Sequence, residues 1–136
     1  MFGEHPLDNE DYGHIVNAKH FARVRGLIDP DKVVLGGVAR EASLKIEPTI
    51  LDGVTPDDAV MQEEIFGPIL PVLAFESLDE AEAFITDRPT PLALYIFSHD
   101  RAVQQRFVRY VPLAAAVSTT RSCTWLRAIW ALAAWE

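Results

Sequence analysis

Cysteine is almost absent from this sequence: Cys123 is the only one in 136 residues. A single thiol forms neither a disulfide framework nor a thiolate metal cage, which argues against a disulfide-stapled secreted scaffold. Long apolar runs are also missing, since no stretch reaches the ~18 residues that span a bilayer as a helix. The first residues carry no basic region followed by an apolar run, as a signal peptide would. We therefore expect a reducing, cytoplasmic setting and no membrane partner.

Basic residues are scarce, with 12 Lys and Arg against 20 Asp and Glu and a net charge of −8. Such a surface repels phosphate backbones, so we expect no nucleic-acid partner. The dinucleotide fingerprint G-x-G-x-x-G is absent, and Gly36-Gly37 is typical of a turn that ends a strand rather than of a phosphate cradle. His14 and His20 face different sides of a predicted helix, so we predict no metal site.

Strand-like and helix-like segments alternate along the first 110 residues, within a length that fits one domain. Residues 77–80 read Ser-Leu-Asp-Glu, a capping box that opens a helix. Strand, helix, strand and helix in this order between residues 69 and 110 predict an α/β unit with parallel crossovers. Extended segments are expected at 33–35, 44–51, 69–75 and 92–97, and helices at 14–28, from 77 to the prolines at 89 and 91, and from 100 onward.

Residues 61–68 read Met-Gln-Glu-Glu-Ile-Phe-Gly-Pro and lead into an apolar run. Two adjacent carboxylates beside an aromatic ring and a Gly-Pro turn indicate a surface that meets a polar group on one side and a flat group on the other. On residue types alone, Glu63 and Glu64 are more often a solvated pair, and Phe66 is more often a core residue.

This segment resembles the signature of the NAD(P)-dependent aldehyde dehydrogenases, and the surrounding sequence resembles their class 3 branch. The resemblance implies an α/β fold, an incomplete parallel-sheet piece of the catalytic domain. It also implies oxidation of a small-molecule aldehyde to a carboxylic acid, with NAD or NADP as cofactor. Ordered matches at compatible spacings extend over about residues 2–112 and comprise residues 2–6, 11–21, 48–51, 60–68 and 91–98.

The resemblance also supplies roles for two residues of the segment. Glu64 matches the position that contacts the hydroxyls of the nicotinamide ribose, and Phe66 matches the residue that packs beside the nicotinamide. Both roles are chemically reasonable, because a carboxylate accepts two hydroxyl hydrogen bonds and an aromatic face packs against a flat ring.

Three parts of the family's machinery have no match here: the dinucleotide-binding domain, the nucleophilic cysteine and the general-base glutamate. Cys123 follows the signature segment, whereas the family's nucleophile precedes it. We therefore expect a fragment with no catalytic residue that is inactive as an isolated chain. One alternative is a non-catalytic α/β binding or regulatory module that associates with a full-length homologue through its sheet edge. Another is an unrelated small α/β domain.

The composition changes abruptly near residue 111. All seven glycines lie at or before Gly67, and all three tryptophans lie after residue 120. Read with the codons shifted by one frame, residues 114–120 and 132–136 can encode glycine-rich segments that resemble the family's continuation. We therefore interpret residues 1–112 as a partial catalytic domain and 113–136 as an out-of-frame tail. Uncovered apolar surface on residues 69–110 would then favour self-association.

Overall fold

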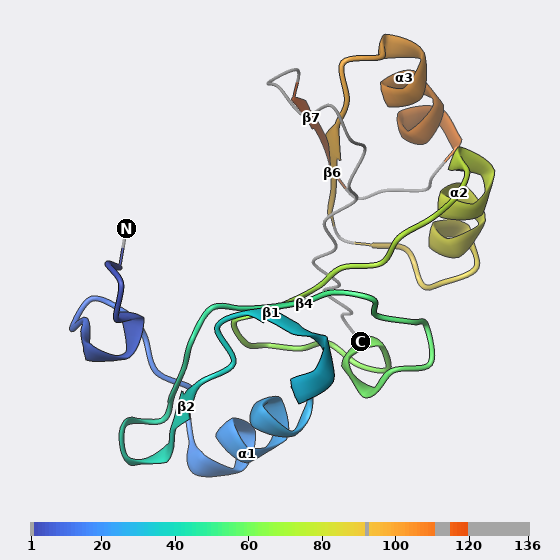
Figure 1. Cartoon of the computed structure of the whole chain (residues 1–136). Helices are drawn as coiled ribbons and strands as arrows, with labels where there is room; N and C mark the ends of the chain where they lie inside the picture. Colours follow the sequence, from blue (N-terminus) through green and yellow to red (C-terminus); the bar gives the residue numbers. More distant parts are fainter. Residues whose placement is uncertain (1, 92, 111–114, 120–136) are drawn as a thin grey trace. The chain divides into compact units, whose positions relative to one another are not determined.

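The computed structural model describes residues 2–91 and 93–110, together with the strand at 115–119. The chain divides into two compact units, Met1–Val72 and Leu73–Glu136 (Figure 1). Within the described residues, no helix is long and apolar enough to cross a membrane.

The first unit contains a three-stranded mixed sheet with the strand order β1–β4–β5. β1 (Val33–Leu35) runs antiparallel to β4 (Thr49–Leu51), and β4 runs parallel to β5 (Ile69–Pro71). A separate antiparallel pair joins β2 (Ala39–Arg40) to β3 (Lys45–Ile46). The centre of the larger sheet is therefore β4, and β1 and β5 are its edges.

The extended segment predicted at residues 44–51 is present as β3 and β4, interrupted at Pro48 as the sequence indicated. Thr49 is 2% exposed at the start of β4, and its hydroxyl donates to the Glu47 carbonyl and accepts from the Gly37 amide. The predicted turn after β1 is confirmed, because Gly36 and Gly37 have φ values of 74° and 91°.

Helix α1 (Ala18–Gly26) starts four residues later than the predicted helix at 14–28. Its N-cap is Asn17, whose side chain accepts a hydrogen bond of 2.8 Å from the His20 amide. An asparagine cap satisfies a backbone donor that would otherwise be free, so it sets where the helix begins. Phe21 and Val24 are buried on the inner face, as the sequence pattern predicted.

Four short 3-10 helices complete the first unit: η1 (Pro6–Asp8), η2 (Pro30–Lys32), η3 (Glu41–Ser43) and η4 (Ala59–Met61). The segment before α1 is held by Tyr12, whose hydroxyl donates a 2.6 Å hydrogen bond to the Ile46 carbonyl. Burial raises the pKa of Tyr12 above its ordinary value, since the phenolate would lose solvation there.

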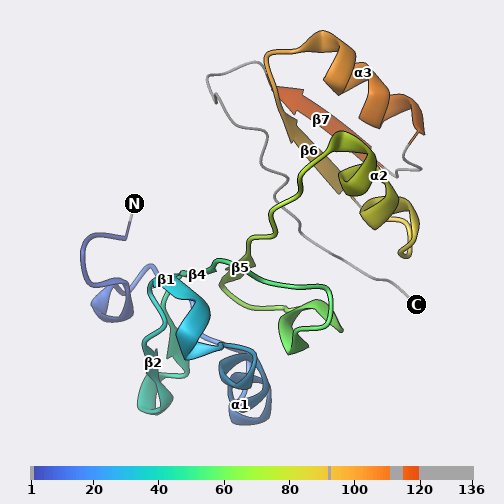
Figure 2. The same cartoon turned by 45° about the vertical axis from the view of Figure 1, so that its right-hand side comes forward.

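The second unit contains a parallel pair of strands, β6 (Ala93–Phe97) and β7 (Ala115–Thr119), connected through α3 (Arg101–Tyr110). Helix α2 (Leu78–Thr86) precedes β6, and both helices lie beside the strand pair (Figure 2). The two helices and β6 share one apolar core, made of Ala81, Ile85, Leu94, Ile96 and Phe107.

The two helices of this unit are also joined by an ion-pair cluster. Arg106 of α3 contacts Asp79 and donates a 2.6 Å hydrogen bond to Glu82, both on α2. Hydrogen bonds to Asp79 and Glu82 raise the pKa of Arg106, so the guanidinium stays charged.

The predicted α/β architecture is confirmed. Within the second unit, the parallel crossover unit is β6–α3–β7. The strand predicted at residues 69–75 ends at Pro71. Part of the predicted tail, residues 115–119, forms a strand, and residues 120–136 lie outside the described part of the chain.

Candidate functional site

The segment singled out in the sequence forms a bend between η4 and β5. Phe66 adopts a left-handed backbone conformation with a φ of 46°, which is unusual for a residue with a side chain. The chain then enters β5, and the first bond to the neighbouring strand runs from the Thr49 amide to the Pro68 carbonyl at 2.8 Å. The expected bend that leads into a parallel strand is therefore present.

The start of this segment is anchored by Asp58, the residue before η4. Its carboxylate contacts the Lys32 ammonium and accepts a 2.7 Å hydrogen bond from the Thr55 amide. The hydrogen bond from Lys32 lowers the pKa of Asp58 below its ordinary value, and the Thr55 amide adds to this effect.

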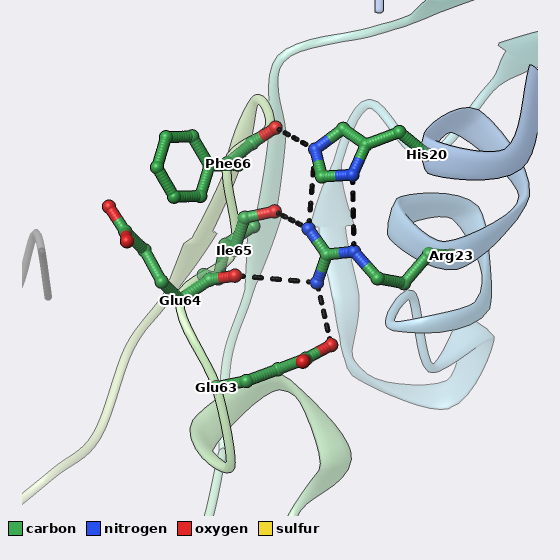
Figure 3. Close-up of polar contacts among 6 residues, drawn as sticks. All are labelled: His20, Arg23, Glu63, Glu64, Ile65 and Phe66. Carbon is green, nitrogen blue, oxygen red and sulfur yellow. Dashed lines mark hydrogen bonds and ion pairs between the residues drawn. The ribbon is translucent and has the colours of Figure 1, made fainter. Parts of the chain in front are cut away.

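Three successive carbonyl groups of the bend face helix α1 (Figure 3). The Arg23 guanidinium donates to the Glu64 carbonyl at 3.3 Å and to the Ile65 carbonyl at 2.6 Å. The next carbonyl, that of Phe66, lies 3.2 Å from His20 Nε2. Two side chains, one helical turn apart, thus provide the hydrogen bonds that a bent backbone does not form with itself.

Arg23 also binds two side chains of the same cluster. One of its terminal nitrogens forms an ion pair of 2.7 Å with the Glu63 carboxylate. Its Nε donates to His20 Nδ1 at 3.3 Å, and its other terminal nitrogen lies 3.4 Å from His20 Nε2. An imidazole whose Nδ1 accepts carries its proton on Nε2 in the neutral form, and that proton points to the Phe66 carbonyl.

The side chains of Glu64 and Phe66 extend from the other side of the bend, away from Arg23 (Figure 3). The Phe66 side chain is 65% exposed, and Glu64 is half-buried. Within the described residues the Glu64 carboxylate has no hydrogen bond, whereas its neighbour Glu63 is paired with Arg23. A free acceptor thus lies two residues from an exposed aromatic ring, and together they suit a ligand with hydroxyl groups and a flat ring.

Glu64 and Phe66, the two residues singled out in the sequence, lie on the same side of the bend, whereas Arg23 had been assigned no role. His20 had been considered only as a metal ligand, a role that its position relative to His14 disfavours, and as part of a helix that resembles one in the family. The available signal was their spacing, because residues three apart on a helix are neighbours and each of these two directly precedes a buried residue, Phe21 or Val24. No group of three or more His, Cys, Asp or Glu suited to a metal ion occurs in the described residues.

This chain is similar to known proteins over most of its length. The sequence model of the aldehyde dehydrogenase family matches residues 2–122. The 4,4'-diaponeurosporen-aldehyde dehydrogenase of Staphylococcus aureus is 51% identical over 110 residues, which are 79% of this chain and 24% of that protein. The dimeric NADP-preferring aldehyde dehydrogenase of Rattus norvegicus is 49% identical over 108 residues, again 79% of this chain and 24% of that protein.

A solved structure, the substrate-bound state of Staphylococcus aureus AldH, superposes with a TM-score of 0.83 at 47% identity. The match covers 86% of this chain and 26% of that one. The chain thus spans about a quarter of the length of the relatives it matches. Since the family model covers most of its length, this chain belongs to the aldehyde dehydrogenase family.

Proposed function

We propose that the bend at residues 63–67 binds the nicotinamide end of NAD or NADP. The Glu64 carboxylate accepts hydrogen bonds from the ribose hydroxyls, and the Phe66 ring packs beside the nicotinamide. The observation that supports this most directly is the shared orientation of these two side chains: a carboxylate without a hydrogen bond among residues 2–91, 93–110 and 115–119, and an exposed ring. An acceptor for two hydroxyls and an aromatic face fit this part of a pyridine nucleotide.

The reaction of the parent enzyme would be the oxidation of a small-molecule aldehyde to a carboxylic acid in the cytoplasm. NAD(P)⁺ is the oxidant when bound. The described residues supply binding and orientation only, because the cysteine nucleophile and the general base of the family have no match in this chain. We therefore expect the 136-residue chain alone to give no aldehyde-dependent formation of NADH or NADPH.

Saturation-transfer NMR with NADH and NADPH tests the binding proposal without requiring turnover. We expect transfer from the chain to nicotinamide and adjoining ribose protons. Glu64→Gln weakens the ribose contacts, and Phe66→Ala removes the nicotinamide signal. Glu10→Gln is the matched control, since Glu10 is exposed and lies away from the bend. Equal transfer in the wild type and in both site variants would overturn the proposal.

A second candidate, a non-catalytic module that binds a full-length homologue, is favoured by one observation. β1 is an edge strand of its sheet, and its residues Val34 and Leu35 are 62% and 58% exposed. Exposed apolar edge strands pair with other chains. Sedimentation of the chain with a purified full-length relative tests this candidate. Complex formation that Val34→Lys and Leu35→Lys abolish supports it, and separate sedimentation refutes it.

We also propose that residues 113–136 are translated out of frame relative to the family. The composition break near residue 111 supports this. The family match argues against this proposal, because it continues to residue 122. The nucleotide sequence decides between them: codons that yield the family's glycine-rich continuation in the shifted frame are expected, and codons that cannot yield it refute the proposal.

A further inference from the structure

The bend depends on a single guanidinium for most of its polar contacts. Arg23 contacts the Glu63 carboxylate, the carbonyls of Glu64 and Ile65, and the ring of His20. These partners come from 40 or more residues away in the chain, apart from His20 on the same helix. A guanidinium presents five N–H donors in a fixed plane, so the positions of its acceptors are coupled to one another.

We propose that Arg23 is a positioning residue for the cofactor-binding bend, acting both directly and through His20. By holding the carbonyls of Glu64 and Ile65 against α1, it turns the side chains of Glu64 and Phe66 to the opposite side. The expected effect of Arg23 on cofactor binding rests on the proposed function. The expected effect on the backbone of the bend and on His20 rests on the geometry alone.

The indirect part of this role is the selection of one imidazole tautomer. Two contacts favour the neutral His20 ring that carries its proton on Nε2: Nδ1 accepts from Arg23 Nε, and the Phe66 carbonyl beside Nε2 can only accept. The Arg23 terminal nitrogen that lies 3.4 Å from Nε2 acts against them. Nε2 lies 3.2 Å from the Phe66 carbonyl and donates to it only in this tautomer. In the other tautomer, an N–H would oppose the Arg23 N–H and a lone pair would oppose the carbonyl oxygen. Arg23 therefore favours the ring state that binds Phe66 in two ways: its Nε donates to Nδ1, and it holds the bend that carries the Phe66 carbonyl.

The contact between His20 and the Phe66 carbonyl matters because Phe66 has a strained backbone conformation. Its φ of 46° is disfavoured for a residue with a Cβ, so contacts around it must maintain the conformation. The ring of His20 also meets the Phe66 ring edge to face, with centroids 6.3 Å apart. The orientation of the exposed ring is thus linked to the state of His20.

The primary test is the tautomer of His20, read from its ring nitrogen chemical shifts in the full chain at a pH where imidazole is neutral. In the wild type we expect a protonated Nε2 and an unprotonated Nδ1. In Arg23→Ala we expect shifts typical of a mixture of both tautomers. Arg25→Ala is the matched control, because Arg25 lies on the same helix and has no side-chain hydrogen bond among the described residues.

Two further variants separate positioning from loss of folding. Arg23→Lys retains the charge but not the planar set of donors, so we expect the mixture of tautomers in this variant as well. The resonances of the buried residues Phe21 and Val24 should stay unchanged, which would show that the variant is folded. Methylguanidinium added at millimolar concentration to Arg23→Ala is expected to restore the Nε2-protonated form. A role limited to general stability would not respond to that ion.

Saturation transfer from the chain to NADH then tests the consequence for binding. We expect Arg23→Ala to reduce the nicotinamide signal at least severalfold and Arg25→Ala to leave it unchanged. If Glu64→Gln reduces the signal and Arg23→Ala does not, the positioning proposal is wrong while the proposed function stands. If the wild type gives no signal, the proposed function fails and the tautomer of His20 alone decides the role of Arg23. An unchanged tautomer in Arg23→Ala and Arg23→Lys overturns that role.

Discussion

Gly67 approaches Val24 so closely that position 67 has no room for a side chain. A Cβ on Gly67 would lie 2.5 Å from Val24 Cγ1 and 3.2 Å from Cγ2, and Val24 is fully buried on α1. The glycine of the Gly-Pro turn is thus required for close packing of the bend against the helix that carries Arg23. Its backbone dihedral angles do not demand glycine, because its φ is not positive.

Gly67→Ala is expected to destabilise the first unit by about 1–3 kcal/mol, the usual cost of overpacking a close-packed interior. Urea unfolding followed by circular dichroism measures this. Gly26→Ala is the control, since a Cβ there meets nothing within 4 Å. Val24→Ala removes the opposing methyl groups, so Gly67→Ala should lower the free energy of unfolding clearly less in the Val24→Ala variant than in the wild type. Equal costs in the two backgrounds would show that the close approach is not the cause.

At Phe66, backbone strain and ligand contact can be separated by two substitutions. Phe66→Ala removes an exposed ring and keeps the left-handed strain, so we expect little change in the free energy of unfolding. Phe66→Gly also removes the strain and should be more stable than Phe66→Ala by about 1 kcal/mol. Both lose the nicotinamide contact proposed above. A Phe66→Gly variant less stable than Phe66→Ala would contradict the left-handed conformation.

Gly36 and Gly53 both have positive φ, but only one of them is crowded. A Cβ on Gly36 would lie 2.1 Å from the Pro48 carbonyl oxygen, whereas at Gly53 nothing lies within 4 Å. Gly53→Ala therefore carries the conformational cost alone, about 1 kcal/mol. Gly36→Ala adds a backbone clash and should cost at least about 3 kcal/mol. Denaturant unfolding of both variants provides the comparison, and similar losses would rule out the clash.

Asp58 makes the stability of the first unit depend on pH in the acid range. Its pKa is lowered in the folded chain by the hydrogen bond from Lys32, so folding favours the carboxylate. The stabilisation is complete above the unfolded pKa, near 3.8, and is lost as the pH falls through the lower folded value. Wild type should therefore exceed Asp58→Asn in stability at pH 6, and the difference should shrink toward pH 2. A difference that does not depend on pH would exclude this linkage.

Features that depend on neighbouring residues could be predicted from the sequence. One half of the capping box at the start of α2 is present as expected, because the Ser77 side chain accepts from the Glu80 amide. The Glu80 carboxylate accepts from the amide of Glu76, one residue before the cap, rather than from that of Ser77. The interruption of an extended segment at Pro48 and the turn at Gly36-Gly37 are equally local. Their partners lie within a few residues, so residue type and spacing suffice.

The start of α1 was predicted wrongly for a related reason. The predicted helix began at His14, but the side chain of Asn17 caps the helix and the Ile15 amide bonds the Leu44 carbonyl at 2.8 Å. A contact with a residue so far along the chain removes residue 15 from the helix. Periodicity contains no information about such a partner.

The sequence by itself determined the α/β class, the family, and the choice of Glu64 and Phe66 as candidate residues. These follow from motifs and local order along the chain. Only the tertiary structure decided that Arg23 and His20 hold the bend, and that Arg23 pairs with Glu63 while the Glu64 carboxylate has no hydrogen bond within the described part of the chain. Those contacts join residues about 40 positions apart, and which of two adjacent carboxylates meets a guanidinium depends on the direction of each side chain after folding.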